Sequence, residues 1–285
     1  MRTQSEAHPT GVASLSAGYR DGTVQVRAVV ETLLAHLADH HDEGVWISVS
    51  DTATLRGRAA ELDASGPEGL PLFGIPVAVK DNIDVAGLPT TAACPAFAYS
   101  PSRDAAAVRR LRDAGAVIVG KTNLDQFATG LSGQRSPYGA CESVFGGDLI
   151  SGGSSSGSAV AVASAIVPVA LGTDTAGSGR VPAALNGIVG LKPTRGLVGT
   201  SGVVPACRSL NCVSVFTHST SDAATVLDVL AGPDPDDPWS RTGPPLPAST
   251  TPRLALPDDL DLDPGIAARF AQVTEVAAAR ADAVV

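Results

Sequence analysis

The sequence of 285 residues has few of the residue types on which several classes of protein depend. It has only four cysteines, none in a CxxC pair or beside a histidine, so it shows no pattern for binding a metal. Basic residues are also scarce, because 20 Lys and Arg stand against 29 Asp and Glu and none gather into a stripe. This balance argues against nucleic acid as a partner.

Long apolar runs are missing as well. No run of about 18 apolar residues is free of helix breakers, so we expect no membrane span. Residues 1–20 lack a basic region followed by an apolar block, so we expect no secretory signal. Cysteines without a pairing pattern are typical of reduced thiols that serve as small apolar residues. These absences predict a cytoplasmic protein with no membrane partner.

Helical and strand-like patterns alternate along the chain. The helical patterns cover residues 24–38, 53–63, 104–115, 156–165 and 221–230. The short apolar strands cover residues 73–79, 116–119, 167–171 and 188–191. Such alternation predicts an α/β fold, in which helices cover a mostly parallel or mixed sheet.

The ends of the chain have a different character. We expect a single domain over residues 1–285, with residues 1–18 frayed. Residues 232–252 are rich in Pro, Asp and Ser, which is typical of a long surface connection. A strand over 253–256 and a helix over 266–283 are expected to follow.

One motif match is misleading. Residues 115–122 fit the P-loop expression GxxxxGK[ST]. A P-loop needs a flexible glycine-rich turn whose N–H groups wrap a phosphate. Here Val117, Ile118 and Val119 are β-branched and form the strand itself. We therefore reject nucleotide binding and a phosphate-binding role for Lys121.

A second match also fails. Residues 153–157 fit the GxSxG nucleophile elbow, and the chain order allows Ser155, Asp174 and His218 as a triad. An elbow needs a strand directly before it, whereas residues 145–151 have the character of a loop. We therefore interpret His218 as a surface residue and expect catalysis without histidine.

Two serine-rich segments and one lysine form a different pattern. The segments GGSSSG (152–157) and TDTAGSGR (173–180) place Ser154 and Ser178 24 positions apart. Lys80 stands upstream in VKDN, at the end of an apolar strand. A desolvated lysine loses its proton more readily and can act as a general base. Two hydroxyls and such a lysine can build a hydrolase that needs no histidine.

These segments resemble the amidase signature family, which uses a Ser-cisSer-Lys triad. The family motifs GGSS[GS]GS, GTDx[GA]GS and VKDN are met at 152–158, 172–178 and 79–82, and the likeness covers about residues 74–205. The resemblance implies the amidase signature fold, with a large mixed twisted β-sheet flanked by helices on both faces. It also implies a hydrolase of linear amides that uses no metal and no cofactor.

The resemblance assigns a role to each group. Ser178 is the expected nucleophile, Ser154 the bridging serine with a cis peptide bond to Gly153, and Lys80 the base. The expected oxyanion hole consists of the N–H groups of Thr175, Ala176, Gly177 and Ser178. Residues expected to support the site from behind are Ser155, Asp174 and Arg180. The expected substrate-binding residues are Ala128, Thr129, Gly130, Ser154 and Arg135.

Flanking segments narrow the resemblance within the family. The stretches 80–99, 120–140, 172–183 and 205–216 are similar to members that hydrolyse allophanate. The form AGSGRV at 176–181 differs from the GGSIR form of general amidases. The expected reaction is therefore hydrolysis of the C–N bond of allophanate (urea-1-carboxylate), a small anion, with release of ammonia.

Several points stay open. The substrate carboxylate needs a cation, and Arg135 and Arg208 are both candidates, although either can equally be structural. Asn211 stands where we expect Asp. Family members run well past this chain, so the amidase domain is expected to be incomplete at its C-terminus. A broad-specificity amidase, an inactive fragment and an amidotransferase A-type subunit remain alternatives, and a homodimer is the expected form of self-association.

Overall fold

The computed structural model describes residues 11–39, 44–241, 253–257, 260–280 and 283–284. The chain splits into two compact units, Met1–Thr242 and Gly243–Val285, and every residue of the candidate site belongs to the first. The expectation of a single domain over the whole chain stays a prediction.

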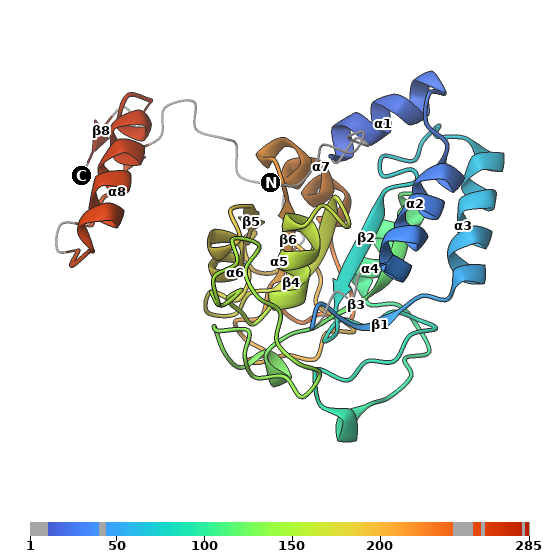
Figure 1. Ribbon diagram of the computed structural model, residues 1–285, viewed down its shortest axis with the longest axis horizontal. Helices are drawn as coiled ribbons and strands as arrows, with labels where there is room; N and C mark the ends of the chain where they lie inside the picture. The colour runs from blue at the N-terminus through green and yellow to red at the C-terminus, as the bar shows by residue number, and fades with distance from the viewer. Residues whose placement is uncertain (1–10, 40–43, 242–252, 258–259, 281–282, 285) are drawn as a thin grey trace. The chain divides into compact units, whose positions relative to one another are not determined.

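A six-stranded sheet with the order β1-β3-β2-β4-β6-β5 is the centre of the first unit (Figure 1). Its strands are β1 (Trp46–Val49), β2 (Pro76–Lys80), β3 (Val117–Thr122), β4 (Val169–Thr173), β5 (Val189–Leu191) and β6 (Val213–Thr217). Its α-helices are α1 (Val12–Asp21), α2 (Val26–Asp39), α3 (Thr52–Ser65), α4 (Ala106–Asp113), α5 (Ser156–Ala163), α6 (Arg180–Leu185) and α7 (Thr220–Leu230). Short 3-10 helices cover Pro95–Phe97 and Gln126–Ala128.

The sheet is mixed, as the sequence predicted. β2 runs parallel to both β3 and β4, whereas the β1–β3, β4–β6 and β5–β6 pairs are antiparallel. Carboxyl ends of parallel neighbours meet at one edge of a sheet, where open α/β proteins place their ligands. The ends of β2 and β4, at Lys80 and Thr173, therefore lie together.

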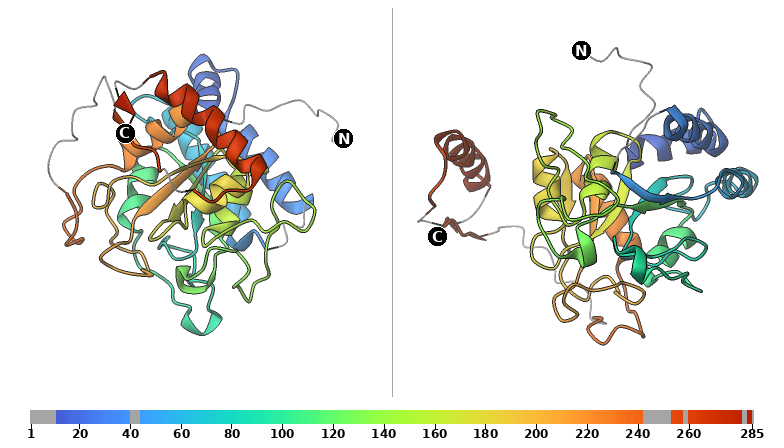
Figure 2. Two further views of the ribbon diagram at one scale, coloured as in Figure 1. Left: turned by 90° about the vertical axis from the view of Figure 1, so that its left-hand side faces the viewer. Right: turned by 60° about the horizontal axis from the view of Figure 1, so that its bottom comes forward.

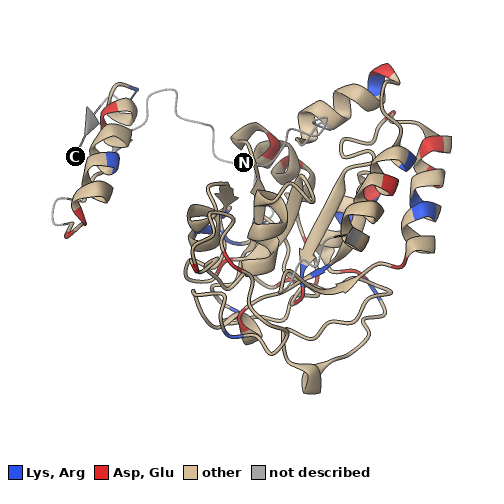
Figure 3. Ribbon diagram, in the orientation of Figure 1, with Lys and Arg blue, Asp and Glu red and all other residues tan. Residues whose placement is uncertain are grey.

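Helices lie on both sides of this sheet (Figure 2), and apolar residues form a core on each of its faces. Side chains alternate along a strand, so Val77 and Val79 of β2 belong to one core and Ala78 to the other. The first core also receives α1, α3, α4 and α7, and the second receives α5 and α6. α5 has no charged residue, in contrast to α3 on the outside (Figure 3). Its small side chains allow close approach, since a Cβ at Gly157 would lie 2.3 Å from Val45 O.

The prediction that residues 1–18 are frayed is wrong for residues 12–18, which belong to α1. Val12, Leu15 and Tyr19 are buried, and the Tyr19 hydroxyl donates a hydrogen bond to Gly74 O at 3.0 Å. The N–H of Ala13 donates to Asp222 Oδ1 at 3.1 Å. The apolar spacing was visible in the sequence, but its stabilisation comes from residues far along the chain. Residues 1–10 lie outside the described part.

Most expected elements are present, with shifted ends, and others were missed. β1, β6 and α6 had no counterpart among the predicted elements. β6 is fully buried, although Ser214 interrupts its apolar run. Residues 232–241 of the expected surface connection pack back on the unit, because the buried Asp237 accepts hydrogen bonds from the N–H and hydroxyl of Thr200. Residues 242–252 of that connection lie outside the described residues.

The second unit holds α8 (Pro264–Ala278) and a parallel pair of two-residue strands, β7 (Arg253–Leu254) and β8 (Ala283–Val284). The predicted strand at 253–256 is thus present in part, and the predicted helix over 266–283 ends at Ala278. Among the residues that the structure describes, no helix has both the length and the apolar character needed to cross a membrane.

Candidate active site

Lys80 lies at the centre of the candidate site. Its side chain is fully buried at the end of β2. Its Nζ lies 2.7 Å from Ser154 Oγ and 2.9 Å from Thr173 Oγ1. Asn82 Nδ2 also donates to Thr173 Oγ1 at 3.3 Å. Lys80 and Ser154 were expected to meet, whereas the roles of Thr173 and Asn82 were missed although both lie inside the quoted motifs.

Burial controls the protonation of this lysine. It lowers the pKa of Lys80 to about 7, although the charges of Asp125 and Asp174 act in the opposite direction. Desolvation penalises the charged ammonium form, and nearby carboxylates favour it. At neutral pH a large share of the Lys80 amine therefore lacks its extra proton, as a general base requires.

The peptide bond between Gly153 and Ser154 is cis, as the resemblance to the amidase signature family implied. Ser154 is completely buried, and its carbonyl accepts a hydrogen bond from Asp125 N–H at 3.0 Å. A Cβ at Gly153 would lie 2.2 Å from Asp125 Oδ2 and 2.7 Å from Gly133 N. Position 153 therefore requires glycine, because no side chain has room there.

Asp125 is a part of the site that the sequence analysis missed. Its buried carboxylate accepts hydrogen bonds from Gly133 N–H (3.0 Å) and Arg135 N–H (2.8 Å). The same residue binds the backbone of Ser154, so it ties the loop over 128–135 to the bridging serine. Asp125 lies inside GKTNLDQFATG, a segment that was used only to compare family members.

Ser178 lies in the loop between β4 and α6 and is almost fully buried. Its carbonyl accepts a hydrogen bond from Ser155 N–H at 3.3 Å, which places the loop beside the residue that follows Ser154. Within the described residues the Ser178 hydroxyl makes no hydrogen bond. The transfer of a proton from Ser178 to Ser154 therefore stays a prediction.

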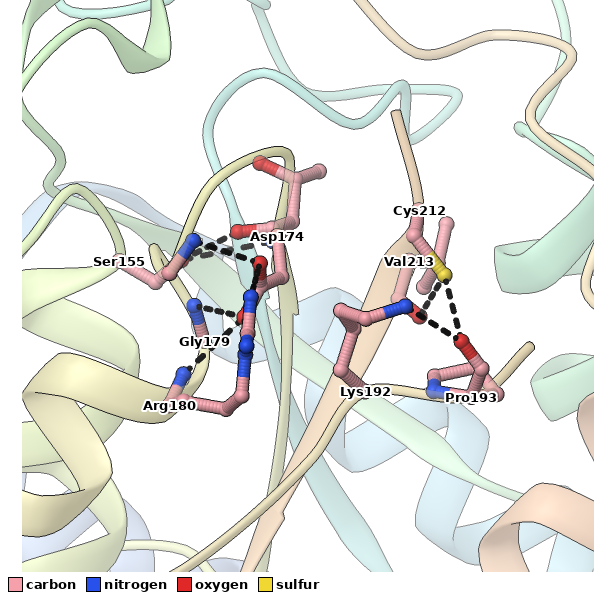
Figure 4. Close-up of polar contacts among 10 residues, drawn as sticks. Ser155, Asp174, Gly179, Arg180, Lys192, Pro193, Cys212 and Val213 are labelled. Atoms are coloured by element: carbon pink, nitrogen blue, oxygen red, sulfur yellow. Dashed lines mark hydrogen bonds and ion pairs between the residues drawn. The ribbon is translucent and has the colours of Figure 1, made fainter. Parts of the chain in front are cut away.

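Asp174 organises this loop (Figure 4). Its carboxylate accepts hydrogen bonds from Gly177, Gly179 and Arg180 N–H, and Arg180 Nε and Nη2 both donate at 2.9 Å. Burial raises the pKa of Asp174, but these hydrogen bonds outweigh it and hold the pKa below its usual value. Asp174 and Arg180 thus support the loop in the manner expected of them. Ser155 also contributes, because its Oγ donates to Thr173 O at 3.2 Å.

One expected oxyanion donor is already occupied. Gly177 N–H donates to Asp174 Oδ1 at 2.8 Å, so it does not face a substrate oxygen. In the described part of the chain the N–H groups of Thr175, Ala176 and Ser178 have no acceptor, and they remain the predicted oxyanion hole. Gly177 instead allows the loop to adopt its conformation here, because a φ of 131° favours glycine.

The expected substrate-binding residues gather around Asp125. Ala128 is buried with φ of 55°, and its N–H donates to Asp125 O at 2.9 Å. Thr129 and Arg135 are exposed, and Arg135 Nη1 lies 3.5 Å from Thr129 O. A Cβ at Gly130 would lie 2.6 Å from Asp125 Oδ2. Contact of these residues with substrate stays a prediction.

A cleft of about 460 Å³ lies next to residues that contact the site, although none of Lys80, Ser154 and Ser178 lines it. Its wall includes Val204, Arg208 and Asn211. The carbonyl of Val204 accepts a hydrogen bond from Asn82 Nδ2 at 2.9 Å, and Asn211 Oδ1 accepts one from the Thr175 hydroxyl at 3.1 Å. The cleft wall is therefore bonded to Asn82, which contacts Thr173, and to Thr175 in the loop that holds Ser178.

The rejected motifs have structural roles or lie at the surface. Lys121 is buried within β3, and its Nζ lies 3.0 Å from Asp81 Oδ1 as an ion pair. His218 is exposed. Ser155 directly precedes α5, with no strand before it. Among the described residues, no group of three or more His, Cys, Asp or Glu side chains is arranged to hold a metal ion.

Comparisons with known proteins agree with this geometry. The family model Amidase matches residues 28–273. Urea amidolyase of Lachancea kluyveri is 55% identical over 224 residues, and that of Saccharomyces cerevisiae is 59% identical over 201 residues. The A-type subunit of the glutamyl-tRNA(Gln) amidotransferase of Symbiobacterium thermophilum is 41% identical over 286 residues. The chain belongs to the Amidase family.

Solved structures show the same fold. The allophanate hydrolase of Kluyveromyces lactis is 44% identical with a TM-score of 0.88, over 96% of this chain and 47% of that one. The A-type subunit of the Thermotoga maritima glutamyl-tRNA(Gln) amidotransferase is 32% identical with a TM-score of 0.78, over 91% of this chain and 57% of that one. The sequence alignments with the two urea amidolyases cover 77% and 70% of this chain but only 12% and 11% of those proteins. The alignment with the Symbiobacterium protein covers 93% of this chain and 58% of that protein.

The pH dependence of activity tests the role of Lys80. If the neutral amine is the base, kcat should rise as pH passes through about 7 and then level off. Asp125→Asn removes a charge that raises the pKa of Lys80, so the rising limb should move to lower pH. Asp113→Asn, at an exposed position of α4, is the matched control and should leave the limb in place. A limb that moves to higher pH in Asp125→Asn would contradict this assignment.

Proposed function

We propose that this chain hydrolyses the C–N bond of allophanate, releases ammonia and serves urea degradation. The observation that carries the proposal is the contact of 2.7 Å between Lys80 Nζ and Ser154 Oγ in a fully buried position. Such a pair has the components of histidine-free acyl transfer. Similarity to the two urea amidolyases and to an allophanate hydrolase supports the choice of substrate.

The first half of the proposed reaction forms an acyl-enzyme. The neutral Lys80 amine takes a proton from the Ser154 hydroxyl, and Ser154 takes one from Ser178. Ser178 Oγ attacks the amide carbonyl, and the negative charge forms beside the N–H groups of Thr175, Ala176 and Ser178. Each well-placed donor of this kind contributes about 3 kcal/mol in the transition state. The relay then returns a proton to the leaving nitrogen, which departs as ammonia.

In the second half water repeats the attack. The same relay removes a proton from water, the C–O bond to Ser178 breaks, and the proton returns to Ser178 Oγ. The product is N-carboxycarbamate, which breaks down to carbon dioxide and ammonia. Every proton removed is returned, so Lys80 ends the cycle as it began.

Arg208 is the better of two candidates for binding the substrate carboxylate. It lines the same cleft as Asn211, whose side chain accepts the hydrogen bond from Thr175. No hydrogen bond or ion pair with another described residue occupies its guanidinium group. Arg135 instead directs Nη1 toward Thr129 O. Guanidinium groups bind carboxylates with two parallel hydrogen bonds.

A second candidate function, that of an A-type subunit of an amidotransferase, has support from one observation. The 41% identity to an A-type amidotransferase subunit extends over 93% of this chain, more than the urea amidolyases match. Release of ammonia from allophanate, from simple amides and from glutamine distinguishes the candidate functions. Equal rates on all three would favour a broad amidase, and no release from any would favour an inactive fragment.

Assembly and location form part of the same proposal. We expect a cytoplasmic protein that forms a homodimer and binds a small anionic amide as its substrate. Light scattering of the purified chain measures the mass directly. A mass of one chain at all concentrations would contradict the dimer.

Substitution of the triad gives the most direct test of the chemistry. Ser178→Ala and Lys80→Ala should each reduce ammonia release from allophanate by at least about 1,000-fold, because each removes the attacking or base group. His218→Ala, an exposed control, should retain activity. If His218→Ala abolishes release while Ser178→Ala does not, the proposed mechanism is wrong.

The arginine assignment has its own test. Arg208→Ala should raise KM for allophanate by about tenfold or more, because one charged hydrogen bond contributes roughly 1.5–3 kcal/mol. Hydrolysis of a neutral amide should change little, since it has no carboxylate. Arg135→Ala tests the other candidate, and under the assignment to Arg208 it should leave KM for both substrates nearly unchanged. The reverse pattern would assign the carboxylate to Arg135.

A further inference from the structure

A buried ion pair beside the site has no part in the proposed reaction. Lys121 and Asp81 are both fully buried, and Lys121 Nζ lies 3.0 Å from Asp81 Oδ1. Lys121 Nζ also donates hydrogen bonds to Thr90 Oγ1 at 3.0 Å and to Pro89 O at 3.2 Å. A buried ion pair adds little to stability once its desolvation is counted, but it can fix one conformation of the chain around it. The other contacts of Asp81 show which segment this pair holds.

Asp81 binds a short segment that has an unusual backbone. Its Oδ2 atom accepts hydrogen bonds from the N–H of Thr91, at 2.9 Å, and from the Thr91 hydroxyl. Thr91 Oγ1 in turn accepts a hydrogen bond from the N–H of Ala93 at 3.1 Å. Ala92 and Ala93 have φ of 50° and 57°, a left-handed conformation that is unfavourable for residues with a Cβ atom. Such a conformation persists only where the surrounding contacts impose it, and it is common at functional sites.

The same segment holds the backbone of the expected substrate-binding residues. Ala92 O accepts a hydrogen bond from the N–H of Phe127 at 2.9 Å, and Ala93 O accepts one from Gln126 Nε2 at 3.0 Å. Ala93 and Ala128 also belong to one small buried cluster. Phe127 and Ala128 are left-handed as well, with φ of 52° and 55°. Two unfavourable stretches of backbone are therefore joined by hydrogen bonds.

We propose that Thr91 is a positioning residue for substrate binding. Its hydroxyl, anchored on the buried carboxylate of Asp81, fixes residues 92–93 and through them the backbone over 127–130. The inference rests on the proposed function, because it takes residues 128–130 to contact the substrate. It gives the buried ion pair a role in binding, although neither of its members is expected to touch the substrate.

Replacement of Thr91 separates binding from chemistry. In the described part of the chain Thr91 makes no hydrogen bond to a triad residue, so its loss should leave the chemical step intact. Thr91→Val in the full chain should raise KM about tenfold and keep kcat within about threefold, measured with the amide that the wild type hydrolyses best. Thr91→Ser keeps the hydroxyl and should restore KM to within about twofold of the wild type.

Thr217→Val is the matched control and should leave KM unchanged. Thr217 is also buried, and its hydroxyl donates to Ser219 O at 2.8 Å. It ends β6, which runs antiparallel to β4, so it lies at the edge of the sheet away from the site. A second variant, Gln126→Met, removes the hydrogen bond to Ala93 O without touching the buried ion pair. It should raise KM in the same way, even if Thr91→Val does not fold.

Hydrogen exchange measures the proposed coupling without a substrate. In Thr91→Val the backbone amides of residues 126–130 should exchange at least about tenfold faster than in the wild type, because the segment that holds them opens more often. The amides of β6 should be unaffected. Thr91→Ser and Thr217→Val should exchange at the wild-type rate over 126–130.

The inference would be overturned by an unchanged KM in Thr91→Val or Gln126→Met, by a loss confined to kcat, or by unchanged exchange over 126–130 in Thr91→Val. If the wild type hydrolyses glutamine or a simple amide but not allophanate, only the proposed function is wrong, and KM for that amide decides the role of Thr91. If the wild type hydrolyses none of these amides, both the proposed function and the inference are wrong.

Discussion

The burial of one amine governs the rest of the site. Lys80 emerges at the end of a central strand with no access to solvent, and a full charge there is costly. The structure offers two oxygen partners, Ser154 Oγ and Thr173 Oγ1, and two carboxylates that act at a distance. Burial lowers the pKa of Lys80 and the two carboxylates raise it, and together they leave this pKa at about 7. A lysine with such a pKa can both take and return a proton at neutral pH. The burial that lowers this pKa therefore also requires the two hydroxyl partners, because a buried amine needs hydrogen bonds.

Two buried carboxylates then hold the two serine-bearing loops. Asp125 gathers the backbone near Ser154, and Asp174 gathers the backbone near Ser178. Each accepts several N–H groups that a loop would otherwise leave unpaired. The same carboxylates partly offset the desolvation of Lys80. Loop geometry and the basicity of Lys80 are therefore coupled, and a change at either carboxylate should affect both.

The sequence predicted the mixed α/β fold, the cis bond before Ser154 and the contact between Ser154 and Lys80. The alternation of helical and strand patterns predicted the fold, and the resemblance of the motifs to the amidase signature family implied the cis bond and the contact. It did not predict α1, since the partners that bury Tyr19 lie elsewhere in the chain. It placed Gly177 among the oxyanion donors because residue type does not tell which N–H group is already bonded. Asp125 was missed for a similar reason, since its importance follows from which distant N–H groups reach it.

A direct titration of the Lys80 amine tests the central claim best. Heteronuclear NMR of the folded chain, with a Lys80→Met variant to assign the signal, follows the side chain across the pH range. The account predicts a midpoint at about 7, because burial disfavours the charged form. A midpoint near the ordinary lysine value of 10.5 would show that Lys80 is fully charged at neutral pH and would contradict its role as the base.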